Sequence, residues 1–224
     1  MLAAALVAQV AWRAASRPGA PAAVELPPAP SARLLRLASF GEPEAGARLA
    51  MLYLQAFDLG GGGTTPYRNL DYRRLVDWLR AVLELDPRSD YPLFSASRVY
   101  AEVPDAARSR LMLEFVYDEF LRDPNRRWPW LAHAALLAKH RLKDLALARR
   151  YAAAVERHTT APNVPLWAKQ MEIFILEDMN ELEAARIMLG GLLESGAVRD
   201  ADEAKFLRQR LEELEARTGR KSSK

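Results

Sequence analysis

Prolines recur in pairs at a fixed spacing through the middle of the chain, and this register constrains the fold more than any other sequence feature. Pro87, Pro124 and Pro162 are separated by 37 and 38 residues. A second proline follows each of them within five residues, at Pro92, Pro129 and Pro165. A proline interrupts a helix that precedes it but fits the first turn of the next helix, where its missing N–H is not needed. Each pair therefore predicts the end of one helix and the beginning of another.

A second mark lies midway in each repeat. Asp105, Asp144 and Asn180 are 39 and 36 residues apart, and Asp and Asn favour the N-cap position of a helix. Apolar residues at helical spacing lie on both sides of each mark. The sequence thus predicts three helix–turn–helix repeats of about 37 residues. The first helices are expected over 93–100, 130–138 and 167–176, and the second helices over 107–121, 145–155 and 182–193.

Helices are also expected on both sides of these repeats. Residues 43–57 and 71–85 have the apolar spacing of a leading helix pair, joined by a glycine-rich loop. Residues 200–217 combine an apolar inner face with alternating Glu and Arg outside, as a capping helix does on an open stack. The prediction is an all-α, helical-hairpin solenoid of about nine helices over 40–217, followed by a disordered basic tail over 218–224.

Small and closing residues recur where a known repeat family has them. Ala148 and Ala184 place small side chains where paired helices approach closely, and Pro124 and Pro162 close successive repeats. This pattern resembles the tetratricopeptide repeat, whose period is about 34 residues. The resemblance covers residues 70–195 and implies a stack of helical hairpins that binds other proteins.

Five short segments are distinctive in addition to the repeat marks, namely 40–43, 78–79, 85–87, 127–130 and 177–181. They make the chain similar to uncharacterised, membrane-anchored tetratricopeptide proteins of Gram-negative bacteria. This resemblance implies a single N-terminal anchor in the bacterial inner membrane and a soluble helical domain, which we expect on the periplasmic side. It implies no known activity.

The beginning of the chain differs in composition from the rest. The first twelve residues contain one polar side chain, Gln9, and are followed by Arg13 and Arg17. Crossing a bilayer takes about 20 apolar residues, and no basic segment comes first, as it would in a secretory signal. One interpretation is a membrane anchor over 1–17 that begins upstream of the first methionine, and the other is a frayed terminal segment. We expect the anchor, followed by a stiff Pro/Ala-rich spacer over 18–39.

No motif predicts catalysis or a cofactor. The chain has no cysteine, which excludes disulfides and thiolate ligands. The glycines at 60–63 lack the lysine and the preceding strand of a phosphate-binding loop, and the histidines lack the further ligands that zinc requires. Acidic residues over 177–183 lie where one helix ends and the next begins, which suits a helix dipole. We therefore expect no enzyme, no metal, no cofactor and no small-molecule substrate. The net charge of +3 is scattered, so no nucleic-acid partner is predicted.

Protein binding is the remaining class, and the residues over 122–130 carry its strongest signal. Arg and Trp are the types enriched at binding hot spots, although the same residues could instead pack the seam between repeats and cap helix ends. In stacked hairpins the first helices line the inner groove, which adds candidates from those helices, Phe174 among them. The candidates are Arg98, Tyr100, Arg126, Arg127, Trp128, Trp130, His133, Lys139, His140 and Gln170.

The expected function is a scaffold or assembly factor tethered to the membrane, with an extended or helical partner segment in the concave groove. The alternative is a structural accessory subunit of a larger membrane protein complex, bound through the outer face or the ends of the stack. An enzyme built on helical repeats is a third, less supported class. A groove lined by Arg, Tyr and His favours the scaffold, whereas an apolar patch at one end of the stack favours the accessory subunit.

Overall fold

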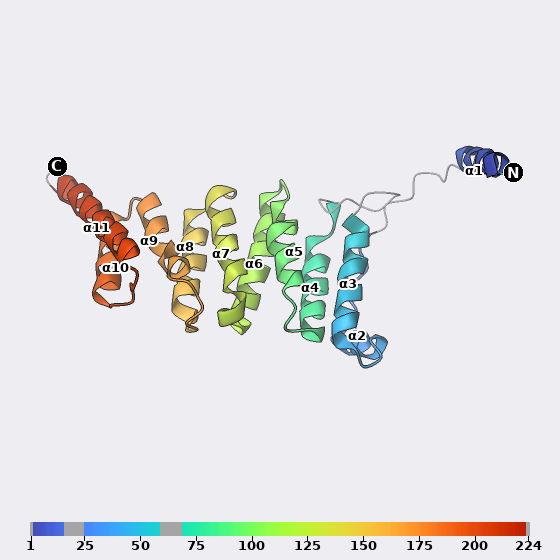
Figure 1. Ribbon diagram of the computed structural model, residues 1–224, viewed down its shortest axis with the longest axis horizontal. Coiled ribbons are helices and arrows are strands. Elements are labelled where there is room, and N and C mark those ends of the chain that lie inside the picture. Colours follow the sequence, from blue (N-terminus) through green and yellow to red (C-terminus); the bar gives the residue numbers. More distant parts are fainter. Residues whose placement is uncertain (1, 16–24, 59–68, 223–224) are drawn as a thin grey trace. The chain divides into compact units, whose positions relative to one another are not determined.

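The computed structural model describes residues 2–15, 25–58 and 69–222, and these residues form eleven α-helices and one short 3-10 helix (Figure 1). No strand occurs in this part of the chain, so the all-α prediction is confirmed for it. The chain divides into two compact units, Met1–Ser89 and Asp90–Lys224, which we call the first and second unit. Eleven helices exceed the nine predicted, because α1 and α2 lie ahead of the predicted helical domain.

The first unit is built on a pair of helices that match the predicted leading pair. Its helices are α1 (Leu2–Ala15), α2 (Ala32–Ala38), α3 (Pro43–Asp58) and α4 (Tyr72–Leu85). α3 packs on α4, and α2 contacts both. Leu54, Leu75 and Leu79 are fully buried and form part of the core. A side chain at Gly46 would place its Cβ 2.8 Å from the Cβ of Ser39, so glycine lets α3 pass close to the end of α2.

Residues 25–38 differ from the spacer that the sequence predicts over 18–39. The Leu26 side chain is only 1% exposed, and the indole of Trp78 donates a hydrogen bond of 2.9 Å to the Pro27 carbonyl. Ser31 then caps α2 by accepting a hydrogen bond from the Leu34 N–H. The spacer prediction fails here because α4 binds two carbonyls of the segment, those of Leu26 and Pro27, and because the Leu26 side chain is buried. Residues 18–24 of the predicted spacer lie outside the described residues.

The predicted membrane anchor coincides with α1, while Met1, Ser16 and Arg17 lie outside the described residues. Leu6, Val10 and Trp12 of this helix are exposed. Among the described residues, no helix combines the length and the apolar character that crossing a membrane requires.

The second unit is a succession of helices that follow the order of the predicted helix pairs along the chain (Figure 1). Its helices are α5 (Tyr91–Arg98), the 3-10 helix η2 (Tyr100–Glu102), α6 (Ala106–Arg122), α7 (Pro124–His140), α8 (Leu145–His158), α9 (Leu166–Asp178), α10 (Leu182–Glu194) and α11 (Ala201–Ser222). Within this unit, each helix packs on the next one along the chain. α7 also contacts α5 and α9, so the first helices of neighbouring pairs meet. α11 continues through Ser222, which contradicts the disordered tail predicted over 218–224 for all but its last two residues.

The midway marks act as N-caps in two of the three repeats. The Asp105 carboxylate accepts hydrogen bonds from the N–H groups of Ala107 and Arg108, and Asp144 accepts one from Leu147. The cap prediction is wrong at Asn180, which has a φ of +61° and precedes the N-cap residue Glu181. Asparagine is one of the few side chains that adopts this left-handed conformation readily, so Asn180 forms the turn instead of capping the helix.

The second repeat also begins earlier than its prolines predict. Asp123 ends α6 and begins α7, so Pro124 occupies the first position of α7 and Pro129 lies inside the helix. Pro129 removes one backbone hydrogen bond close to the start of the helix, where the cost of a proline is local. In the other two repeats the second proline behaves as predicted, with Pro92 in the first turn of α5 and Pro165 at the N-cap of α9.

Candidate partner-binding surface

Five aromatic side chains lie in the first two turns of α5, α7 and α9, and we call them the aromatic row. The rings of Phe94 and Trp130 meet edge to face with centroids 5.9 Å apart, and those of Trp128 and Trp167 meet in the same way at 5.6 Å. Tyr91 stacks beside Phe94 at 6.4 Å. One aromatic pair therefore spans each junction between successive first helices.

The backbone explains why α7 can serve both junctions. Trp128 and Trp130 are two residues apart on a helix with 3.6 residues per turn, so they point to nearly opposite sides. Trp130 accordingly meets α5, and Trp128 meets α9. Edge-to-face pairs of this kind contribute about 0.5–1.5 kcal/mol beyond their area, so the row also helps to hold the repeats together.

Part of the aromatic row remains open to solvent. The Trp167 side chain is 53% exposed and Phe94 is 40% exposed, while Tyr91, Trp128 and Trp130 are half-buried. Large aromatic side chains that are fixed by neighbours and still accessible are typical anchors of protein interfaces. The row can therefore accept an apolar side chain from a partner without first reorganising.

Polar side chains fix the turns from which the aromatic row projects. The Asn125 side-chain oxygen accepts hydrogen bonds from the N–H groups of Thr160 and Ala161, at 2.8 and 2.9 Å. These bonds hold the α8–α9 connection against the start of α7, which places Trp167 beside Trp128. Arg126 forms an ion pair with Asp123 at 3.0 Å on the same turn.

Three of the ten predicted partner-binding residues are buried and serve the fold instead. Tyr100 is 1% exposed, Arg127 is 4% exposed and Gln170 is 4% exposed. Arg127 pairs with the buried carboxylate of Glu119 at 2.9 Å, and Gln170 donates a hydrogen bond to Glu203. These three side chains are therefore not open to a partner, and Tyr100 and Gln170 do not line an open groove. The sequence does not show which face of each helix meets its neighbour.

Six of the other seven predicted residues divide between two ends of the same helices. Trp128 and Trp130 belong to the aromatic row, and Arg126 lies on the same turn. Arg98, Lys139 and His140 instead lie in the last turns of α5 and α7, where Lys139 pairs with Asp178 and the other two are exposed. The ten residues consequently do not form one site.

Three members of the aromatic row were not among the predicted residues, namely Tyr91, Phe94 and Trp167. A signal for two of them was present, because Phe94 and Trp167 each follow the second proline of their repeat by two residues. Trp130 follows Pro129 by one residue, whereas Tyr91 and Trp128 precede their prolines. The proline register therefore indicates an aromatic residue near the start of each first helix, but not the full row.

His133 is half-buried on α7, and its Nε2 atom is buried without a hydrogen-bond partner. Burial lowers the pKa of this imidazole below its ordinary value of 6.5, and the positive charge of Arg98 lowers it further, whereas Glu102 acts in the opposite direction. The site therefore favours the neutral form of the side chain.

This pKa shift predicts a loss of stability in mild acid. The unfolded chain takes up a proton on His133 more readily than the folded chain, so the free energy of unfolding should fall as pH drops below 6.5 and level off below the lowered pKa. Urea unfolding of wild type and of His133→Leu at several pH values measures this contribution. Leu136→Ala on the same helix, which replaces an exposed and non-titrating side chain, is the matched control and should keep the wild-type pH dependence. An equal pH dependence in wild type and His133→Leu would contradict the prediction.

A separate apolar hollow of about 420 Å³ lies against α9 and α10. Its walls come from Leu166, Ile173, Met188 and Leu192, with Gly191 among the lining residues. A Cβ at Gly191 would have no other atom within 4 Å, so there is room for a side chain at this lining position. The hollow can take an apolar side chain of a bound protein.

Comparison of the chain with protein-family models, with curated proteins and with solved structures gave no match. The functional interpretation therefore depends on the arrangement of side chains described above. In the described part of the chain, no three His, Asp or Glu side chains are grouped so that they could hold a metal ion.

Proposed function

We propose that the chain is a non-enzymatic, tetratricopeptide-like scaffold that binds an extended or helical segment of a partner protein. The observation that carries this proposal is the aromatic row, with Trp167 and Phe94 fixed by edge-to-face contacts and still largely exposed. The contacts of α7 with α5 and α9 support the stacked-hairpin form of the scaffold. The proposal includes a tether to the bacterial inner membrane through residues 1–17, supported by their apolar composition, with the helical domain in the periplasm.

Binding at the row would follow the usual physics of an interface hot spot. A partner's apolar side chain placed against Trp167 or Phe94 removes aromatic surface from water, and the turn held by Asn125 keeps the rings in position. Because the rings are already ordered, little side-chain entropy is lost on binding. Arg126 and Asp123 at the edge of the row would contribute more to the choice of partner than to affinity.

Removing the exposed rings should strongly reduce partner capture and leave the fold intact. We expect Trp167→Ala combined with Phe94→Ala to reduce recovery of bound proteins by about 30-fold, as for loss of a hot spot. The measurement is quantitative mass spectrometry after affinity purification of the full chain from its membrane fraction, with circular dichroism to verify helix content.

Leu121→Ala is the matched control, because Leu121 is 42% exposed at the end of α6 and lies outside the aromatic row. It should retain wild-type recovery. Equal recovery with the double variant, or an equal loss with Leu121→Ala, would contradict a role for the row.

A second candidate function is that of an accessory subunit in a larger membrane complex, and the apolar hollow on α9 and α10 favours it. Gly191→Leu would fill the hollow while the aromatic row stays intact. Loss of the partners in Gly191→Leu together with their retention in the aromatic double variant would select the accessory subunit over the scaffold.

A further inference from the structure

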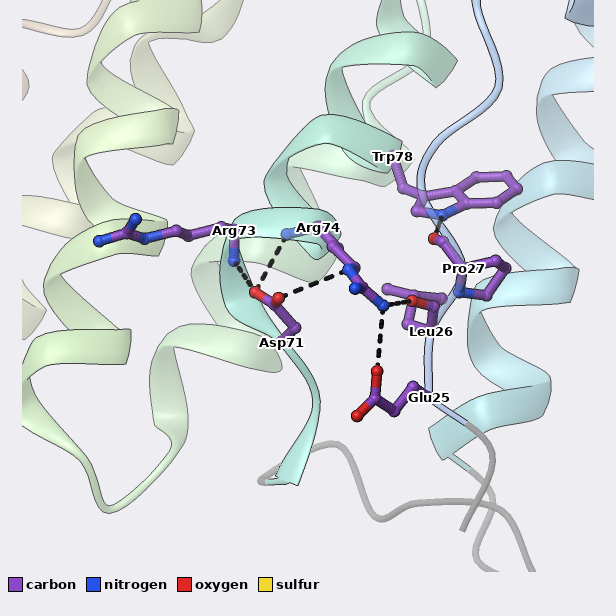
Figure 2. Close-up of polar contacts among 7 residues, drawn as sticks. All are labelled: Glu25, Leu26, Pro27, Asp71, Arg73, Arg74 and Trp78. Carbon is purple, nitrogen blue, oxygen red and sulfur yellow. Dashed lines mark hydrogen bonds and ion pairs between the residues drawn. The ribbon is translucent and has the colours of Figure 1, made fainter.

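Residues 25–30, which we call the strap, are held on α4 through their backbone (Figure 2). Arg74 Nη1 donates a hydrogen bond of 2.8 Å to the Leu26 carbonyl, and Trp78 Nε1 donates one of 2.9 Å to the Pro27 carbonyl. The Leu26 side chain is buried. Two carbonyl contacts and one apolar anchor are the means by which proteins recognise extended peptides in general.

The composition of the strap suits this form of recognition. Prolines at 27, 28 and 30 favour an extended conformation, in which carbonyls stay available because no internal hydrogen bonds form. Glu25 adds an ion pair with Arg74 at 3.3 Å, but its carboxylate is 86% exposed, so it contributes preference for an acidic residue more than affinity.

The receptor side is positioned by residues outside the strap. Asp71 caps α4 by accepting hydrogen bonds from the Arg73 and Arg74 N–H groups, and its second oxygen lies 3.6 Å from Arg74 Nε. Figure 2 shows the Arg74 side chain between Asp71 and the strap. On the other side, the Tyr53 ring lies 5.2 Å from the Trp78 ring and supports the indole. Both donors would therefore keep their places if the strap left.

At its far end the strap continues into α2, which buries none of its side chains, and Leu34 and Leu37 of that helix are exposed. α2 packs on α3 and α4, and Arg36 donates a hydrogen bond of 3.2 Å to the Glu84 carbonyl. Segments with few buried contacts open at low free energy, before the rest of a protein unfolds. Leu26 is therefore the principal side chain that keeps the strap in place.

We propose that the Arg74–Trp78 face of α4 is a binding site for a partner segment in which an acidic residue is followed by leucine and two prolines. The chain's own strap occupies this site in cis as a replaceable ligand. The site belongs to the first unit and shares no residue with the aromatic row, so it goes beyond the proposed function. An intramolecular ligand acts at about millimolar effective concentration, so the intact strap excludes all but high concentrations of a competing segment.

The test uses the full chain and a fluorescent peptide with the sequence of residues 24–31, followed by fluorescence anisotropy. Leu26→Asp should release the strap and increase the apparent affinity for the peptide at least about tenfold over wild type, because the cis competitor is lost. Adding Arg74→Gln and Trp78→Phe to Leu26→Asp should remove that gain, because the two donors are lost while an aromatic ring remains at 78.

Leu34→Asp is the matched control, since Leu34 is 56% exposed on α2, and it should bind the peptide as weakly as wild type. Circular dichroism verifies the fold of each variant, and Leu26→Ala replaces Leu26→Asp if helix content falls. No gain in affinity with Leu26→Asp, or undiminished binding after loss of both donors, would overturn the proposal. A wild-type dimer that Leu26→Asp converts to a monomer would overturn it as well, because the occupant would then be the strap of a second copy.

Discussion

Replacing Arg127 with methionine is expected to lower the free energy of unfolding of the second unit by about 3–5 kcal/mol, as is typical when one partner of a buried ion pair is removed. Arg127 and Glu119 side chains are 5% and 1% exposed, and their charged atoms are 2.9 Å apart. Without the guanidinium, the Glu119 carboxylate would stay buried with a single cation near it, Arg122, whose side chain is 59% exposed. Urea unfolding followed by circular dichroism measures the loss.

The same arginine also completes the end of α6. It donates a hydrogen bond of 2.8 Å to the Glu119 carbonyl, one of the last-turn carbonyls that lack regular helical partners. The Asp123 N–H bonds to the Phe120 carbonyl instead. Arg127 therefore secures the one-residue connection between α6 and α7, and through it the position of the turn that carries Trp128 and Trp130.

Two further variants separate these effects. Arg122→Met removes a cation 3.1 Å from the same carboxylate, but from an exposed side chain, so its cost should stay within about 1 kcal/mol. The double variant Glu119→Leu with Arg127→Met removes both buried charges and should recover most of the stability, because apolar residues often replace a buried pair without loss. Equal losses for Arg122→Met and Arg127→Met would show that the burial of the pair does not matter.

Helix ends were predictable where they depend on local chemistry. A proline or an aspartate acts within one turn of its own position, so Pro92, Asp105 and Asp144 mark the ends that the structure has. The prediction failed at Pro129 because α7 begins well before it. Asp123, six residues earlier, is both the last cap of α6 and the first cap of α7. A proline register fixes the period of the repeat more firmly than the start of any one helix.

Contacts between repeats follow the same period, although their partners could not be predicted. Several polar links join residues 33 to 36 positions apart, close to the predicted repeat length. They are Arg110–Asp144, Asn125–Thr160, Arg150–Glu114 and Arg210–Glu177. The sequence supplies the separation but does not show which of several charges at that separation will meet. The partners of the strap could not be predicted for the same reason. Its carbonyls accept hydrogen bonds from Arg74 and Trp78, which lie about fifty residues later in the chain.

The kind of site, a surface with exposed aromatic side chains, was predictable, but the residues that form it were only partly predictable. Trp128 and Trp130 were identified because tryptophan beside a helix junction is a strong signal for either packing or binding. Tyr100 and Arg98 were assigned to the same groove, yet one is buried and the other is exposed. α5 ends at Arg98 and Tyr100 begins η2, so the helical periodicity of α5 does not determine where Tyr100 points.

Because Tyr100 is buried and Arg98 is exposed, the two residues should differ in their effect on stability. Tyr100→Ala is expected to lower the free energy of unfolding by about 3–5 kcal/mol. Tyr100 is among the largest fully buried side chains of the chain, so truncation leaves a cavity next to the junction of α5 and α6. Arg98→Ala, two residues earlier and exposed, should change stability by less than about 0.5 kcal/mol. Urea unfolding of both variants provides the comparison.

The Tyr100 variant also tests where partner binding resides. If the aromatic row carries binding, Tyr100→Ala that remains folded at low temperature should recover partners as wild type does, whereas the Trp167 and Phe94 variant should not. If a stable Tyr100→Ala protein had lost its partners, Tyr100 would be required for binding. That result would contradict the assignment of binding to the aromatic row. The two variants thus distinguish Tyr100, which stabilises the fold, from Trp167 and Phe94, which are proposed to bind the partner.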